Sequence, residues 1–215
     1  MIQNNLIQNW KIALNNKQFK YALFTVIVLL ISQFVFISYF QMEIELRPGV
    51  SFNDPIMKYF SPISLDLPMF IALYLAHILA VYLAFKHPET FLHLAIGYFL
   101  VYFFRIFSIS LIPLDPPIGT IILDDPILYW FGGGDITKDL FYSGHTSSTF
   151  MAFLITKNKK AKTFIGISLL IIVVGMLLQR VHYSIDVYAA FFFTFTAYRL
   201  ALFIKNKICK SVVMD

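Results

Sequence analysis

The sequence predicts an all-α membrane protein with six transmembrane helices and both termini in the cytoplasm. Hydrophobic residues make up 59% of the chain and charged residues only 13%, whereas soluble domains average about 45–50% and about 25%. Six apolar runs approach the length needed to cross a bilayer, which is about 20 residues. If these runs alternate in direction, the lysines between them fall on one side.

The six apolar runs differ in how clearly they indicate a span. The first is too long for the core of a signal peptide, so we expect it to remain as an uncleaved span. The fourth is short and begins with polar residues. The runs are 21–40, 67–85, 90–112, 140–156, 163–179 and 183–204.

The charges between the runs predict the orientation. Lysines cluster in residues 11–20, 157–162 and 205–210, and basic loops stay in the cytoplasm. The other side carries most of the acidic residues. The net charge of +5 is no sign of nucleic-acid binding, because the lysines lie at helix ends and not along one face.

The ends of the chain form separate segments. In residues 1–20, Ile2, Leu6, Trp10 and Leu14 recur every four positions, which predicts an amphipathic helix on the membrane surface. A disordered tail is the alternative. Residues 21–204 form the six-span domain, and residues 205–215 form a basic cytoplasmic tail.

Two polar stretches interrupt the apolar sequence at the outer ends of predicted spans. Residues 139–146 carry His145, and residues 180–186 carry His182 and Asp186. Ionisable side chains are costly in or near a bilayer, so they are functional candidates there. The predicted topology brings both stretches to the same depth near the outer leaflet.

The residue types suit attack on phosphorus. His182 and Asp186 are four positions apart and share a helix face. The carboxylate would hold the imidazole in one tautomer, which leaves the other nitrogen as a nucleophile. His145 would act as the general acid that protonates the departing oxygen. A structural His–carboxylate pair is the alternative for His182 and Asp186.

Further polar residues are candidates for holding a phosphate. Ser143 and Gly144 begin a helix, where an anion is favoured. Arg105 lies roughly 10 Å below the outer end of the third span, by the helical rise of 1.5 Å per residue. Arg105, Arg180 and Lys138 are cations at this depth. The chemistry requires no metal or other cofactor, although two histidines and an aspartate also suit a three-ligand zinc site.

These stretches resemble a known family. Residues 140–146 and 182–187 are similar to the two catalytic motifs of the sphingomyelin synthase family, within the type 2 phosphatidic acid phosphatase superfamily. Gly134-Asp135 and Asp139 loosely resemble its lead-in, and residues 105–113 weakly resemble its arginine-to-proline stretch. The phosphatase branch has an arginine six positions before the second histidine, where this chain has Met176. Its lysine-to-Arg-Pro motif is also missing, which favours the synthase branch.

The resemblance implies a His182–Asp186–His145 triad, a phosphohistidine intermediate and transfer of a phosphorylated headgroup between lipids. The expected substrates are membrane lipids: a phospholipid donor and a ceramide or diacylglycerol acceptor. Hydrolysis by a lipid phosphatase is the alternative, since the same intermediate serves both, and a small transporter is the non-enzyme alternative. We expect a plasma or inner membrane location with the site on the extracytoplasmic side. The loop 113–138, with Gly132–Gly134, is either a connection or a lid over the site.

Overall fold

A computed structural model of the chain describes residues 2–125 and 136–210, and the regular elements in those residues are helical. A short 3-10 helix, Met57–Tyr59, follows the second α-helix. The glycine run 132–134 and Asp135 lie outside the described residues, so the predicted hinge and lead-in remain predictions. The α-helices are α1 (Ile2–Asn15), α2 (Lys17–Leu46), α3 (Asp66–Phe85), α4 (Pro88–Leu111), α6 (Gly144–Ile155), α7 (Lys159–Leu178) and α8 (Ser184–Lys210).

Five of these helices are long and apolar enough to cross a membrane, namely α2, α3, α4, α7 and α8. The predicted fourth span is α6, which has only 12 residues. Its length of about 18 Å is well short of the roughly 30 Å hydrocarbon core. The six-span count is therefore not confirmed, whereas the all-helical prediction is confirmed for the described residues, five of whose helices are candidate membrane spans.

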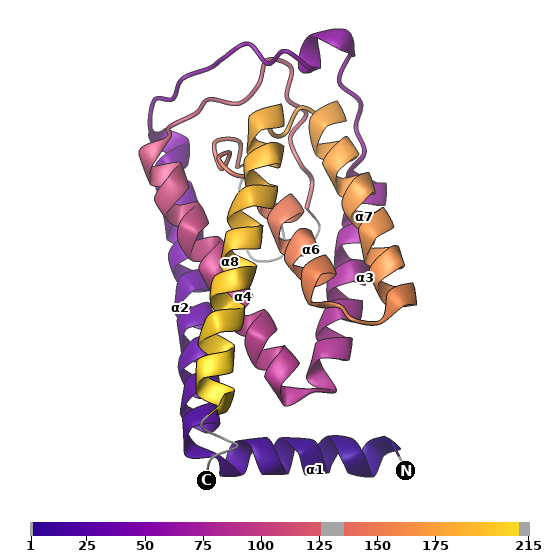
Figure 1. Ribbon diagram of the computed structural model, residues 1–215. Helices are drawn as coiled ribbons and strands as arrows, with labels where there is room; N and C mark the ends of the chain where they lie inside the picture. The colour runs from indigo at the N-terminus through magenta and orange to yellow at the C-terminus, as the bar shows by residue number, and fades with distance from the viewer. Residues whose placement is uncertain (1, 126–135, 211–215) are drawn as a thin grey trace.

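The short helix α6 occupies the middle of the bundle. It contacts α3, α4, α7 and α8, and Figure 1 shows it enclosed between longer helices. Backbone groups must be satisfied inside a membrane, and irregular backbone is tolerated there only when protein surrounds it. Because its neighbours shield it from lipid, α6 can begin and end within the bundle.

The N-terminal segment forms α1, which lies across the end of the bundle where α8 also ends (Figure 1). Trp10 fixes it there. Its indole nitrogen donates to the Phe85 carbonyl at 2.8 Å, and its ring lies 5.0 Å from that of Phe85 and 5.7 Å from that of Phe91. The predicted helix is present, and its position on a membrane surface remains a prediction, as does the cytoplasmic location of this end.

The loops that follow α2 and α4 meet at the opposite end of the bundle. Val50 and Leu114 form a parallel bridge, in which the Val50 amide donates to the Pro113 carbonyl at 2.9 Å. Gly49 permits this approach, because a Cβ at that position would lie 2.5 Å from the backbone of Leu114. The two loops thus form one layer over the starts of α6 and α8.

Candidate active site

The pair His182 and Asp186 lies at the start of α8. The Nδ1 atom of His182 is 3.4 Å from Oδ2 of Asp186, and the two side chains are 3% and 0% exposed. The same Oδ2 accepts a hydrogen bond from the Tyr183 amide at 3.0 Å. The carboxylate therefore holds the turn that precedes the helix and faces one nitrogen of the imidazole.

The structure brings the two polar stretches together. The Ser143 amide donates to the backbone carbonyl of Asp186 at 3.3 Å. Leu140 and Tyr183 pack in one buried cluster. The His145 ring lies within electrostatic range of both His182 and Arg105. Residues 37 positions apart in sequence are therefore neighbours, as the predicted topology requires.

His145 is the second residue of α6. Its half-buried ring lies edge-on to Phe70 of α3, with ring centroids 6.0 Å apart. Ser143 caps this helix, because its hydroxyl accepts from the Thr146 amide and donates to the Thr146 hydroxyl at 3.0 Å. In this structure the Ser143 hydroxyl acts as a helix cap, and its predicted contact with phosphate remains a prediction.

Arg105 holds the segment that leads into α6. Its Nη1 forms an ion pair with Oδ1 of Asp139 at 2.8 Å. Its Nε donates to the Tyr142 carbonyl at 2.7 Å, and its Nη2 donates to the Asp139 carbonyl at 3.0 Å. Three anchored contacts make Arg105 a positioning residue for His145 in this structure, and its predicted phosphate contact remains a prediction.

Asp139 is the centre of this anchoring. Besides the ion pair, its Oδ2 accepts from Gln41 of α2 at 2.7 Å. Burial raises the pKa of the Asp139 carboxyl, but the nearby Arg105 charge and the hydrogen bonds from Arg105 and Gln41 outweigh it and hold this pKa below its ordinary value. The carboxylate therefore stays ionised and paired at neutral pH.

Lys138 and Arg180 hold loops in this structure. The Lys138 ammonium is 3.0 Å from Asp115 and donates to the Arg47 carbonyl at 2.7 Å. Arg180, whose φ of 57° is in the left-handed region, donates to three loop carbonyls, those of Met57, Phe60 and Ile118, at 2.7–2.9 Å. None of these bonds joins Lys138 or Arg180 to another predicted site residue. A phosphate-binding role for these two cations therefore remains a prediction.

Asp54 is a functional candidate that the sequence interpretation missed. Its Oδ2 accepts from the Ser184 amide at 2.6 Å, and its Oδ1 accepts from the Ile56 amide at 2.8 Å. Burial raises the pKa of Asp54, but these backbone hydrogen bonds dominate and leave the pKa below its ordinary value. An acid from the first loop thus caps the helix that carries the second polar stretch. An Asp before a proline indicates a turn, but nothing in the sequence identifies the distant helix that it caps.

Glu45 is a second functional candidate that the sequence interpretation missed. Its carboxylate accepts from the backbone amides of Thr137 and Lys138 at 2.9 and 3.0 Å. Gln41, four positions earlier on α2, binds Asp139. The upper end of α2 therefore binds the segment just before α6 at three consecutive residues.

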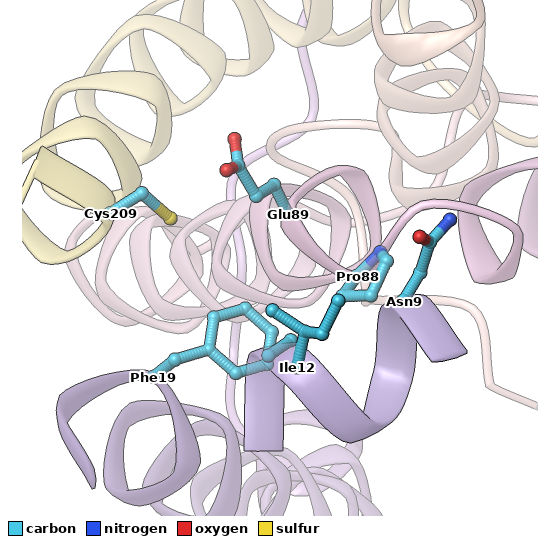
Figure 2. Close-up of a pocket in the computed structure, with 7 residues that line it drawn as sticks. Asn9, Ile12, Phe19, Pro88, Glu89 and Cys209 are labelled. Atoms are coloured by element: carbon cyan, nitrogen blue, oxygen red, sulfur yellow. The ribbon is translucent and has the colours of Figure 1, made fainter. Parts of the chain in front are cut away.

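Two cavities lie far from the histidine pair, at the end of the bundle that α1 covers. Figure 2 shows one of about 170 Å³, lined among others by Asn9 and Ile12 of α1, Glu89 of α4 and Cys209 of α8. The other, of about 140 Å³, lies between α4, α8 and the end of α6. Within residues 2–125 and 136–210, no group of three His, Cys, Asp or Glu residues is arranged to hold a metal ion.

A model of a known protein family matches the C-terminal part of the chain. Residues 138–202 match the family described as PAP2 superfamily C-terminal. No curated protein matches the chain, and no solved structure does. The matched region includes both histidine motifs, all of α6 and α7 and most of α8. This part of the chain is therefore similar to the type 2 phosphatidic acid phosphatase superfamily, whose members are phosphatases or phosphotransferases.

Proposed function

We propose that the protein is a sphingomyelin synthase-like lipid phosphotransferase that moves a phosphorylated headgroup between lipids through a phosphohistidine on His182. The observation that carries the proposal is the buried His182–Asp186 pair, held by a backbone hydrogen bond against the start of the helix that carries His145. The PAP2 superfamily match supports the general chemistry, which is lipid phosphatase or phosphotransferase activity.

In the first half-reaction, Nε2 of His182 attacks the headgroup phosphorus of the donor phospholipid. The P–N bond forms as the P–O bond to the diacylglycerol breaks, and His145 gives a proton to the departing oxygen. Asp186 faces Nδ1 at 3.4 Å. This is slightly long for a hydrogen bond, and such contacts commonly shorten when substrate binds.

In the second half-reaction, the hydroxyl of an acceptor lipid attacks the phosphohistidine. His145, now neutral, takes the acceptor proton, and the P–N bond breaks to restore His182. Water in place of the lipid alcohol gives hydrolysis with the same residues. A lipid held beside the intermediate has the advantage of orientation, which lowers a barrier by about 7–11 kcal/mol at best.

Product partitioning tests this proposal. Purified protein is incubated with a phospholipid labelled in its headgroup phosphate, with and without ceramide or diacylglycerol. We expect label in a new lipid whenever a lipid alcohol is present, and more of it than in the free phospho-headgroup. If only the water-soluble product forms with every alcohol tried, the protein is a phosphatase and the transferase proposal is wrong.

We also propose that the site faces the extracytoplasmic side. The lysine clusters 157–162 and 205–210 lie toward the end of the bundle opposite the histidine pair, and basic loops stay in the cytoplasm. A membrane-impermeant histidine reagent added to intact cells should therefore inactivate the enzyme, whereas the same reagent acting only on opened cells would mean that the orientation is inverted.

Gly144→Ala should slow turnover by about tenfold to a hundredfold, the size expected when a catalytic group is displaced by an ångström or less. The new Cβ would lie 3.0 Å from Nε and 3.1 Å from Cζ of Arg105. The guanidinium must then shift, and with it the segment that sets the start of α6. The measurement is kcat, with the melting temperature as a check on folding.

Gly166→Ala is the matched control for this prediction. It is also a helical glycine, on α7, where the new Cβ would meet the ring of Phe153 at 3.2 Å. We expect it to leave kcat within about twofold, because it contacts no residue of the candidate site and alanine favours a helix. Equal activity in Gly144→Ala and Gly166→Ala would contradict the positioning role of Arg105.

A further inference from the structure

The 140 Å³ cavity at the far end of the bundle combines an apolar wall with a basic mouth. Leu154 and Ile155, from the last turn of α6, and Leu202 of α8 line it, together with Lys157 and Lys205. Along both chain segments the apolar residues come first and a lysine follows within one turn, in the direction of the bundle end. The polarity of the cavity therefore changes from apolar inside to cationic outside.

Its charges leave a net positive mouth. Lys205 is 3.5 Å from Glu89, a pair whose carboxylate side chain is 62% exposed while the lysine side chain is only 15% exposed. Because its carboxylate is exposed and the distance is long, this pair binds weakly. Among the residues that the structure describes, Lys157 forms no ion pair, and it lies with Lys205 within electrostatic range of the buried His93 ring.

Polar groups also reach the inside of the cavity. His93 is 7% exposed, and its Nε2 lies 3.2 Å from the Tyr198 carbonyl. Thr90, in the first turn of α4, is a further lining residue. Glu89 lines both this cavity and the neighbouring one that Figure 2 shows.

We propose that this cavity binds the headgroup phosphate of an anionic phospholipid from the leaflet at the α1 end of the bundle. Two lysines supply charge complementarity for one phosphate, and the leucines and isoleucine behind them accept the start of the acyl region. Basic pockets between membrane helices are suited to anionic headgroups in this way. The site is separate from the proposed chemistry, and its occupant contacts the far ends of the two helices that begin at the histidine motifs.

Binding is measured by native mass spectrometry of the purified full chain in detergent, with phosphatidylglycerol and phosphatidylcholine added in equal amounts. We expect wild type to retain phosphatidylglycerol preferentially. The double variant Lys157→Gln/Lys205→Gln should bind it about tenfold more weakly or worse, because each lysine near a membrane surface contributes about a factor of five to attraction of an anionic lipid. Lys157→Gln alone should weaken phosphatidylglycerol binding about fivefold. Because Lys157 is exposed, this single variant still tests the site if the double variant misfolds.

The matched control is Lys159→Gln/Lys160→Gln, which removes the same charge from exposed lysines that do not line the cavity. Phosphatidylglycerol binding should stay within about twofold of wild type in this control. Equal loss of phosphatidylglycerol in both double variants, or equal loss of phosphatidylglycerol and phosphatidylcholine in Lys157→Gln/Lys205→Gln, would overturn the site. Displacement of the lipid by millimolar inorganic phosphate would assign the cavity to free phosphate and overturn the lipid proposal. Because the readout is binding and not turnover, failure here leaves the proposed function untouched.

Discussion

His182→Gln lowers the turnover of labelled phospholipid by at least about 10⁴-fold, the size typical of removing a nucleophile. Glutamine preserves much of the volume at a position that is 2% exposed, but it has no nitrogen lone pair to attack phosphorus. The expected variant is folded and membrane-inserted, with an unchanged melting temperature within a few degrees. The measurement is the initial rate of headgroup release from the donor lipid.

His87→Gln is the control for this experiment. His87 is exposed and precedes α4, and its side chain makes no capping hydrogen bond there. It should retain wild-type turnover. Appreciable activity in His182→Gln would exclude a nucleophilic role for His182 and leave the pair with Asp186 as a structural contact.

His145→Ala should reduce phospholipid turnover by about 10²- to 10⁴-fold, the usual contribution of general acid catalysis. The loss should be much smaller with a p-nitrophenyl phosphodiester, because nitrophenolate leaves without a proton. Deletion of the ring also removes an edge-on contact with Phe70, so each rate is compared with that of Phe70→Leu, which disturbs the same contact but retains the acid. Equal losses on both substrates would contradict the acid role.

The sequence was sufficient to predict where the long helices lie and which two polar stretches lie next to each other. The apolar runs and the placement of lysines between them predicted the five long helices that the structure describes. Each helix that faces lipid must be apolar whatever its neighbours are, so each one can be recognised separately. The span predicted at residues 140–156 is not confirmed, because the helix there is 12 residues long. Enclosure by four neighbouring helices removes the length requirement, and enclosure is a tertiary property that a single apolar run does not encode.

The candidate site was predictable to the level of its motifs but not of its supports. The predicted phosphate contact of Arg105 remains a prediction, and its pairing with Asp139 was not foreseen from the sequence. Asp54 and Glu45 anchor the starts of two chain segments from loops and helix ends far away in sequence. Such pairs depend on how the loops pack over the bundle, and neither spacing nor composition specifies that packing.

The central claim is a phosphate carried on His182, and trapping of that adduct under alkaline denaturing conditions tests it most directly. Purified protein is mixed with headgroup-phosphate-labelled phospholipid, denatured at alkaline pH to preserve a P–N bond, and digested for mass spectrometry. Label is predicted on the peptide that contains His182, enhanced in His145→Ala when the p-nitrophenyl donor is used and absent in His182→Gln. Turnover in which no labelled peptide appears, or in which the label lies on His145, would contradict the account.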